Sequence, residues 1–397
     1  MGSQSLRLRR VSAFEILLGR HQYIEVSISA TLDYSSISGP RINWRFDGKI
    51  VMTTTKIAPW RATCLQVSSR LSVKGNDRSA AWQIINSNIQ HALGMIRAAV
   101  EGDQPPNLVL LPEFALQGPP HGLAVPDWIQ LACCPIPGAI TEPFQKLAKE
   151  KQIYIGGHQF DTDPEWPGRY FNTCFLVAPN GEVILRYRRI NTAAFPSPHD
   201  FMDAYLARHS MAEVFPVVDT ELGRIAMIPC GEINVPEVAR VLMMQGAEII
   251  LHPTNSPRRP PQEAAKVVRA AENMMFLISA NVAGGIGFSF DGSIPGGRSH
   301  ILDYLGRTLA YEDSDRETTD VTALIDVGAL REARKLDTGT SNPLLRARWE
   351  FYRPFYASAS FYPPNQFLET PMVDAESAKP ALRASIKNMA AVGVIVE

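Results

Sequence analysis

The stretch Leu108-Val109-Leu110-Leu111-Pro112-Glu113 decides the fold class of this chain. Its apolar run is unbroken by polar residues, which is typical of a strand that helices bury on both faces. A helix is predicted before it, between a capping Asp77 and a stop at Gly102, from apolar residues of helical spacing at Trp82, Ile85, Ile89, Leu93 and Ile96. A helix that leads into a buried strand indicates an α/β fold.

The same alternation continues along the chain in both directions. Further strands are predicted at 62–67, 153–156, 174–178, 183–187, 225–229, 247–251 and 276–280. Helices are predicted after Thr141, over 198–208, over 262–273, and from a capping-box-like start at Asn234 and Glu237 to Gly246. Residues 179–181 are Pro-Asn-Gly and predict a hairpin between two of the strands. This order of elements predicts strands covered by helices on the outside.

The composition excludes several classes of protein. Of the 397 residues, 45% are hydrophobic and 20% are charged, which indicates a globular chain and not a disordered one. The 39 Lys and Arg against 40 Asp and Glu leave a net charge of −1, so we expect neither nucleic acid nor a membrane as a partner. The longest uncharged stretch, 273–290, contains Asn281 and three glycines, which a membrane helix rarely combines. We therefore expect a cytoplasmic protein.

The spacing of cysteines, histidines and glycines predicts no metal and no organic cofactor. The five cysteines form no CxxC pair and no disulfide framework, and the eight histidines show neither HxH nor HExxH. The glycine-rich stretch 284–287 lacks the GK[ST] that completes a phosphate-binding loop.

Three chemically active residues stand at the ends of predicted strands, where α/β folds place their sites. Glu113 follows 108–111, Arg189 follows 183–187, and Cys230 follows 225–229. Each has an ordinary alternative role, because a cysteine after a buried strand is often an inert apolar residue and a charged strand end is often solvated or ion-paired. Their joint occurrence is more specific than any one of them.

In these motifs the sequence resembles the carbon-nitrogen hydrolase, or nitrilase, superfamily. The resemblance covers about 60–335 in family order and rests on Leu111-Pro112-Glu113, residues 181–189, Cys230-Gly231-Glu232, 236–240, 269–273, 279–281, 296–299 and 305–307. It implies an α/β fold of the nitrilase type, a four-layer αββα sandwich. We accordingly divide the chain into an N-terminal extension (1–58), a hydrolase domain (59–335) and a C-terminal tail (336–397).

The resemblance also implies which residues do the chemistry. The family's catalytic Glu, Lys and Cys fall on Glu113, Arg189 and Cys230, and the arginine is a departure, since no lysine occurs from 182 to 265. An arginine can stabilise charge but cannot exchange protons at neutral pH. Around the triad we expect the oxyanion to bind at the N–H of Gly231. Three further residues are substrate-binding candidates: Glu232, Asn255 and Asp200. The alternative role of Glu232 is an ion pair within the core, and that of Asp200 is a first-turn helix residue.

The predicted activity is hydrolysis of a small amide or carbamoyl compound through a thioester on the cysteine. Nitrile hydrolysis with the same residues and a non-catalytic, metabolite-binding role remain as alternatives. Family nitrilases commonly carry Trp where this chain has Gly231, which favours an amide. The resemblance further implies a homo-oligomer, a dimer or larger. The aromatic residues between Trp349 and Tyr362, predicted to lie in irregular chain, are expected to be buried between subunits.

Overall fold

The computed structural model describes residues 57–192, 195–257, 259–285 and 295–396, and the backbone of 28–33 and 41–46. The chain divides into two units, Met1–Lys56 and Ile57–Glu397. In the first unit, β1 (Ile28–Asp33) pairs antiparallel with β2 (Arg41–Phe46). The predicted domain boundaries at 58 and 335 stay predictions, since the second unit includes the tail as well as the hydrolase domain.

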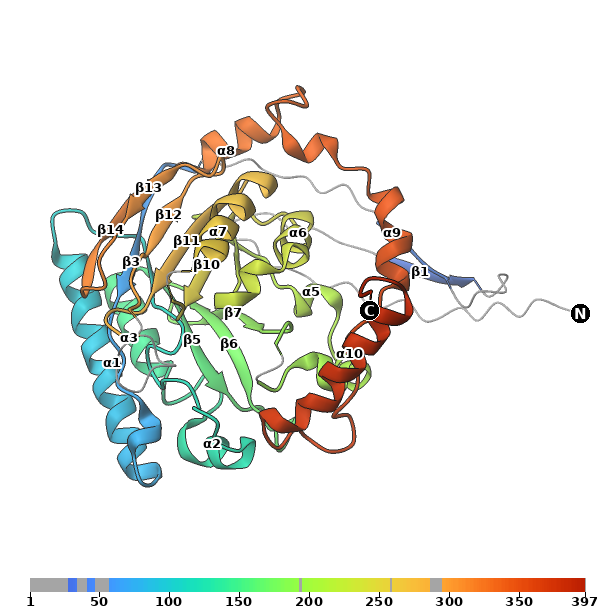
Figure 1. The fold of residues 1–397 in the computed structure, drawn as a ribbon. Coiled ribbons are helices and arrows are strands. Elements are labelled where there is room, and N and C mark those ends of the chain that lie inside the picture. The colour runs from blue at the N-terminus through green and yellow to red at the C-terminus, as the bar shows by residue number, and fades with distance from the viewer. Residues whose placement is uncertain are drawn as a thin grey trace, which may run out of the picture. The chain divides into compact units, whose positions relative to one another are not determined.

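The second unit is built on two six-stranded mixed sheets that face each other, as Figure 1 shows. One sheet has the order β14-β3-β4-β5-β6-β7 and the other the order β13-β12-β11-β10-β9-β8. The strands of the first are β3 (Trp60–Gln66), β4 (Leu108–Leu110), β5 (Tyr154–Asp161), β6 (Phe171–Val177), β7 (Val183–Arg188) and β14 (Thr318–Ile325). Those of the second are β8 (Val218–Thr220), β9 (Gly223–Met227), β10 (Ile249–Thr254), β11 (Phe276–Asn281), β12 (His300–Leu302) and β13 (Thr308–Tyr311).

Helices cover the outer faces of both sheets. The first sheet is covered by α1 (Arg78–Glu101) and α3 (Glu142–Lys151), with α2 (Val125–Ala132) packed on α1. The second is covered by α6 (Pro236–Met244) and α7 (Pro260–Asn273). Because the sheets have helices outside and apolar side chains between them, the predicted α/β sandwich is confirmed.

Most helices and strands lie at the positions that the sequence pattern predicted. Asp77 caps α1 by accepting from the N–H of Ala80, and Gly102 ends the helix. The predicted hairpin is the antiparallel pair β6 and β7. No helix in the described part of the chain is long and apolar enough to cross a membrane.

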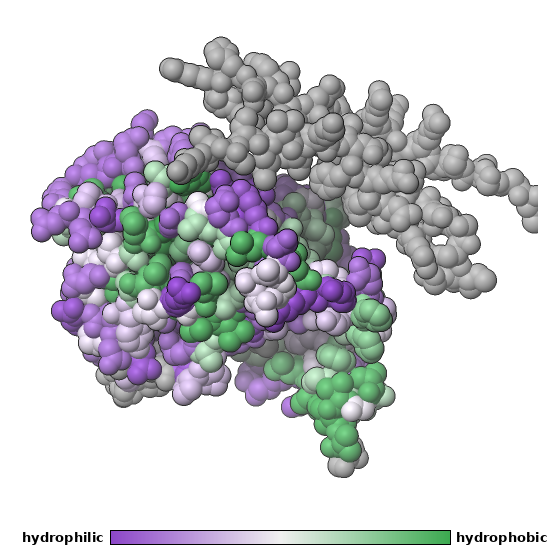
Figure 2. Space-filling view, turned by 90° about the horizontal axis from the view of Figure 1, so that it is seen from above, coloured by the Kyte–Doolittle hydropathy of each residue, from purple (hydrophilic) through white to green (hydrophobic). Residues whose placement is uncertain are grey.

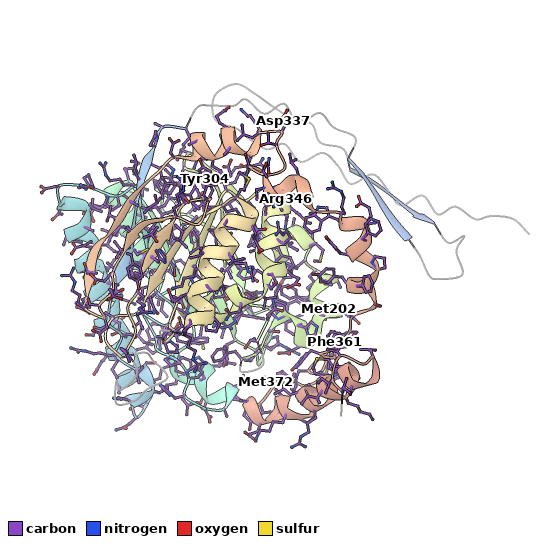
Figure 3. All side chains as sticks on the ribbon, turned by 45° about the horizontal axis from the view of Figure 1, so that its top comes forward. Met202, Tyr304, Asp337, Arg346, Phe361 and Met372 are labelled. Carbon is purple, nitrogen blue, oxygen red and sulfur yellow. The ribbon has the colours of Figure 1, made fainter. Side chains whose placement is uncertain are left out.

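The C-terminal part of the chain, after β14, is mainly helical. It contains α8 (Val327–Arg334), α9 (Trp349–Ser358), α10 (Lys379–Ala391) and, between them, the short 3₁₀ turns η4 (Pro343–Arg346) and η5 (Ala375–Ala378). The prediction of irregular chain at Trp349 was wrong, because these residues form α9 in spite of an internal proline, Pro354. Figure 3 shows Phe361 and Met372 of this tail on the same side of the unit as Met202.

The tail is bonded to the segment that follows strand β7. The N–H of Asn365 donates to the carbonyl of His199 at 3.1 Å, and the N–H of Phe367 donates to the carbonyl of Asp200 at 2.9 Å. The segment they hold comprises η2 (Pro198–Phe201), α4 (Met202–Leu206) and, further on, α5 (Met211–Val214). The tail therefore braces the chain between β7 and β8.

Candidate active site

Cys230 stands at the turn that joins the second sheet to its covering helix. It follows β9 and begins η3 (Cys230–Asn234), a 3₁₀ turn that leads into α6. Its φ of 40° lies in the left-handed region, which non-glycine residues adopt rarely and at a cost of about 1–3 kcal/mol. The predicted capping box at Asn234 was wrong, because η3 extends to that residue and Pro236 starts α6 without a side-chain cap.

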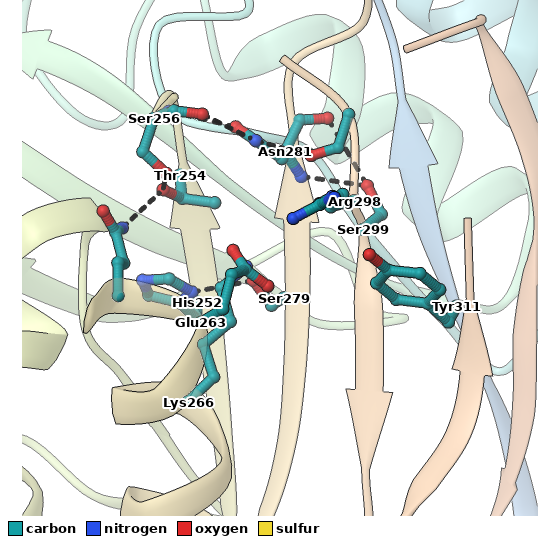
Figure 4. Close-up of polar contacts among 12 residues, drawn as sticks. His252, Thr254, Ser256, Glu263, Lys266, Ser279, Asn281, Arg298, Ser299 and Tyr311 are labelled. Carbon is teal, nitrogen blue, oxygen red and sulfur yellow. Dashed lines mark hydrogen bonds and ion pairs between the residues drawn. The ribbon is translucent and has the colours of Figure 1, made fainter. Parts of the chain in front are cut away.

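His252 holds this strained turn from the neighbouring strand β10. Its Nε2 lies 2.9 Å from the carbonyl oxygen of Cys230. Its Nδ1 lies 2.8 Å from Oγ of Ser279 on β11, as drawn in Figure 4. A carbonyl can only accept, so Nε2 carries the proton and Nδ1 accepts from the serine hydroxyl. Burial lowers the pKa of His252 to about 3, so the ring is neutral at physiological pH.

Glu113 reaches the same place from the first sheet. It follows β4 through Leu111 and Pro112, and its side chain is fully buried. Its Oε1 accepts a hydrogen bond of 3.1 Å from Nδ2 of Asn172 on β6 and lies 3.6 Å from Nη1 of Arg189. Among the described residues, its Oε2 is buried without a conventional hydrogen bond. This oxygen is the one available to take a proton.

Arg189 directly follows β7 and completes the group. Its backbone N–H donates to the carbonyl of Asn172 at 2.9 Å, and its Nε donates to the carbonyl of Asn191 at 3.2 Å. A Cβ added to Gly231 would lie 3.4 Å from Nη2 of Arg189. The guanidinium therefore spans from the Glu113 carboxylate to the backbone beside Cys230.

The three groups shift one another's proton affinities. Burial and, after it, the Glu113 carboxylate raise the pKa of the Cys230 thiol, and Arg189 opposes them, so that the thiol pKa is raised to about 12. Burial also raises the pKa of Glu113, while Arg189, Asn172 and the Cys230 thiol lower it. The resting thiol is therefore protonated, and it becomes a nucleophile only if its proton moves to a base beside it.

Glu232 fixes the chain that carries the arginine. Its Oε2 accepts from the hydroxyl of Tyr187 at 2.9 Å. Its Oε1 accepts from the N–H of Ile190 at 3.1 Å, and from both the N–H and Nδ2 of Asn191 at 2.8 Å. Since Glu232 lies two residues after Cys230, these bonds tie the turn at the nucleophile to the segment just after Arg189.

Asn255 lies beside the nucleophile through its backbone. Its carbonyl oxygen is 3.7 Å from Sγ of Cys230. The loop is held by Asn281, which bonds the N–H and the carbonyl of Ser256 and the carbonyl of Gly297, as Figure 4 shows. The structure thus places Asn255, Gly231 and Glu232 beside Cys230 or its turn, and their roles in substrate binding stay predictions.

Asp200 is placed differently from the other candidates. Its Oδ2 accepts from the N–H of Ser197 at 2.8 Å, and the two side chains form a capping box at the start of η2. Burial raises the pKa of Asp200 to about 6. In the described chain, the side-chain hydrogen bonds of Asp200 stay within this cap, which is the alternative role of a first-turn residue.

Two polar residues of the site had no signal in the sequence. Asn172 and His158 are each 1% exposed and lie inside fully buried strands of the first sheet. A polar residue in such a strand has no periodicity of its own, so only the paired contacts of the folded chain reveal it. The described residues contain no group of three or more His, Cys, Asp or Glu placed to hold a metal ion.

Comparison with known proteins finds relatives that match more than half of the chain. Omega-amidase NIT2 of Mus musculus is 26% identical over 259 residues, which cover 64% of this chain and 87% of the relative. A formamidase of Bacillus cereus (strain B4264) is 27% identical over 231 residues, which cover 57% of this chain and 64% of the relative.

Solved structures of low sequence identity share the fold. A carbon-nitrogen hydrolase from Helicobacter pylori G27 aligns with a TM-score of 0.57 at 21% identity, covering 76% of this chain and 99% of that one. A variant of the amidase from Nesterenkonia sp. AN1 aligns with a TM-score of 0.55 at 17% identity, covering 76% and 98%. The family model of carbon-nitrogen hydrolases matches residues 62–335, well over half of the sequence. The chain belongs to the carbon-nitrogen hydrolase family.

Proposed function

We propose that this enzyme hydrolyses a small amide or carbamoyl compound through a thioester on Cys230. The observation that carries the proposal is the convergence of a buried carboxylate, a guanidinium and a thiol from two facing sheets, with Arg189 3.6 Å from Glu113. A thiol with a raised pKa needs a base beside it, and Glu113 is the carboxylate in that position. Arg189 takes the place of the family's lysine.

The reaction proceeds in two halves. Glu113 takes the thiol proton as Sγ of Cys230 attacks the amide carbon, and the negative charge that builds on the oxygen is stabilised by the N–H of Gly231 and by Nη2 of Arg189. When the C–N bond breaks, the protonated Glu113 gives its proton to the leaving ammonia or amine. Water, deprotonated by Glu113, then attacks the thioester and releases the carboxylic acid and the free thiol.

Relatives support this chemistry. The mouse and B. cereus relatives are named omega-amidase and formamidase. The structure of the Nesterenkonia sp. AN1 amidase variant shows covalent addition of the acetamide moiety of fluoroacetamide at its active site cysteine.

Ammonia release tests the proposed reaction class. The purified full chain is incubated with small amides, carbamoyl compounds and nitriles in parallel, and free ammonia is measured against the Cys230→Ala protein. We expect release from at least one amide or carbamoyl compound and none from the variant. Release from nitriles alone would contradict the amide assignment, and equal release by the variant would place the chemistry elsewhere.

We further propose a cytoplasmic homo-oligomer in which α9 contacts a second copy of the chain. On α9, Phe351 is 75% and Phe355 76% exposed, and Tyr352 and Tyr356 are exposed as well. Hydrophobic side chains gather in patches on the face shown in Figure 2. Large apolar rings exposed together on one helix are typical of an interface.

Truncation before Trp349 should lower the oligomeric state, because it removes these rings. Light scattering measures the mass of the assembly. A second variant, in which Phe351 and Phe355 are both replaced by serine, removes the exposed rings and keeps the tail. An unchanged mass in both proteins would contradict an interface at α9.

A further inference from the structure

A chain of hydrogen bonds begins and ends at the turn that carries Glu113. Asn172 Nδ2 donates to Oε1 of Glu113 at 3.1 Å, and Asn172 Oδ1 lies 2.9 Å from Nε2 of His158. Nδ1 of His158 lies 3.3 Å from the backbone nitrogen of Phe114, the residue after Glu113. The chain links β5, β6 and the end of β4, and every side chain in it is buried.

The donors and acceptors at its two ends fix the position of every proton in this series of hydrogen bonds. The N–H of Phe114 can only donate, so Nδ1 of His158 accepts, and Nε2 must carry the ring proton. Nε2 then donates to Oδ1 of Asn172, which leaves the amide nitrogen to donate to Glu113. If the Asn172 amide were reversed, its N–H would face the N–H of His158 Nε2, and its oxygen would face the Glu113 carboxylate. Both hydrogen bonds would be lost.

The imidazole keeps this arrangement at physiological pH. Burial lowers the pKa of His158, the bond with Asn172 opposes this, and Arg189 adds to it, so that the ring pKa is lowered to about 3. A protonated ring would present N–H to the N–H of Phe114. Phe114 has a φ of 61°, so this bond also supports a turn that a non-glycine residue adopts rarely.

We propose that Asn172 and His158 are positioning residues that lock Oε1 of Glu113 and so leave Oε2 to receive the thiol proton from Cys230. This rests on the proposed role of Glu113 as the base. Oε1 accepts from Asn172 and is faced by Arg189, and Oε2 makes no hydrogen bond of ordinary geometry among the described residues. The Cys230 thiol and the backbone of Asn255 also face the carboxylate and lower its pKa. A carboxylate free to rotate would exchange its two oxygens and misplace the base.

The lock also sets the acidity of the base. Glu113 is faced by Arg189 after β7, by Cys230 at η3, and by Asn172 and Cys174 on β6. The amide of Asn172 donates to the charged carboxylate and therefore lowers its pKa. Removing the Asn172 donor destabilises the charged Glu113 carboxylate and raises its pKa. The acid limb of the pH profile of kcat/KM must therefore move to higher pH.

The experiment compares Asn172→Leu with Asn342→Leu as a matched control. Asn342 is also a buried asparagine, but its side chain bonds backbone groups around η4, in the C-terminal tail. We expect Asn172→Leu to lower kcat by about 10²-fold with little change in KM, and to raise the acid-limb pKa of kcat/KM. Asn342→Leu should lower Tm and leave the pH profile in place.

Two substitutions at His158 separate the effects of its two hydrogen bonds. His158→Gln keeps an N–H that can reach Asn172, whereas His158→Leu removes both bonds. We expect the glutamine to retain more activity than the leucine and to show the smaller shift of the acid limb. If the activities followed this order but the acid limb of the pH profile stayed in place in all variants, the hydrogen bonds of His158 would have only a structural role. That result would overturn the proposal.

The rate of Cys230 alkylation by iodoacetamide makes the test independent of turnover. Peptide mass spectrometry follows the adduct as a function of pH in the parent and in Asn172→Leu. A shifted acid limb in alkylation supports the lock even if none of the tested amides is a substrate, which would contradict the proposed function alone. An identical alkylation profile in the two folded proteins would overturn the lock itself.

Discussion

Replacing Cys230 by alanine should abolish turnover while the protein stays folded. The loss should be on the order of 10⁴-fold or more, as expected when a covalent nucleophile is removed. The fold should persist because alanine keeps the backbone, the bond from His252 goes to the carbonyl, and Sγ lies as far as 3.7 Å from the carbonyl oxygen of Asn255. Ammonia release and the melting temperature measure the two effects.

Cys64→Ala is the matched control for that substitution. Cys64 lies on β3, is fully buried, and burial raises the pKa of its thiol far above the ordinary range. It faces the packed interior, so its loss should affect stability and leave turnover in place. Substantial activity in Cys230→Ala, or loss of activity in Cys64→Ala at unchanged stability, would end the assignment of the nucleophile.

Replacing Arg189 should separate charge stabilisation from proton transfer. Arg189→Met should lose on the order of 10²-fold or more in kcat, because it removes an oxyanion donor and leaves the buried Glu113 without its counter-charge. Arg189→Lys should keep measurable activity, since an ammonium can still stabilise the oxyanion. Steady-state kinetics of both variants against the parent measure the difference.

Two outcomes would contradict this role of the arginine. If Arg189→Met were as active as the parent, the guanidinium would serve only to hold the segment at Asn191. If Arg189→Lys were far more active than the parent, the arginine would be a defect in the catalyst and not its adapted cation.

The fold was predictable because its strands and helices carry strong local signals. Buried strands such as β4 are continuously apolar, and the turn residues Pro179, Asn180 and Gly181 mark the hairpin. The error at Asn234 shows the limit of cap patterns, since an Asn and a Glu at the right spacing were outweighed by a proline two residues on. The helix at Trp349 was missed because its proline suggested irregular chain.

The site was predictable only where its residues stand at the ends of strands. Glu113, Arg189 and Cys230 each follow a recognisable strand, so topology brings them together. Asn172 and His158 sit within strands, and their meaning depends on which strands pair and in what register. The role of Glu232 was likewise beyond the sequence, because its partners Tyr187 and Asn191 lie more than forty residues earlier in the chain.

Trapping the acyl-enzyme tests the central claim most directly. The full chain is mixed with an amide that releases ammonia, quenched in acid during turnover, digested, and analysed by peptide mass spectrometry. We predict the acyl group of that amide on the peptide containing Cys230 in the parent, and no such adduct in Glu113→Gln, whose amide cannot take the thiol proton. Turnover with an unmodified Cys230, or with the acyl group on another residue, would contradict the account.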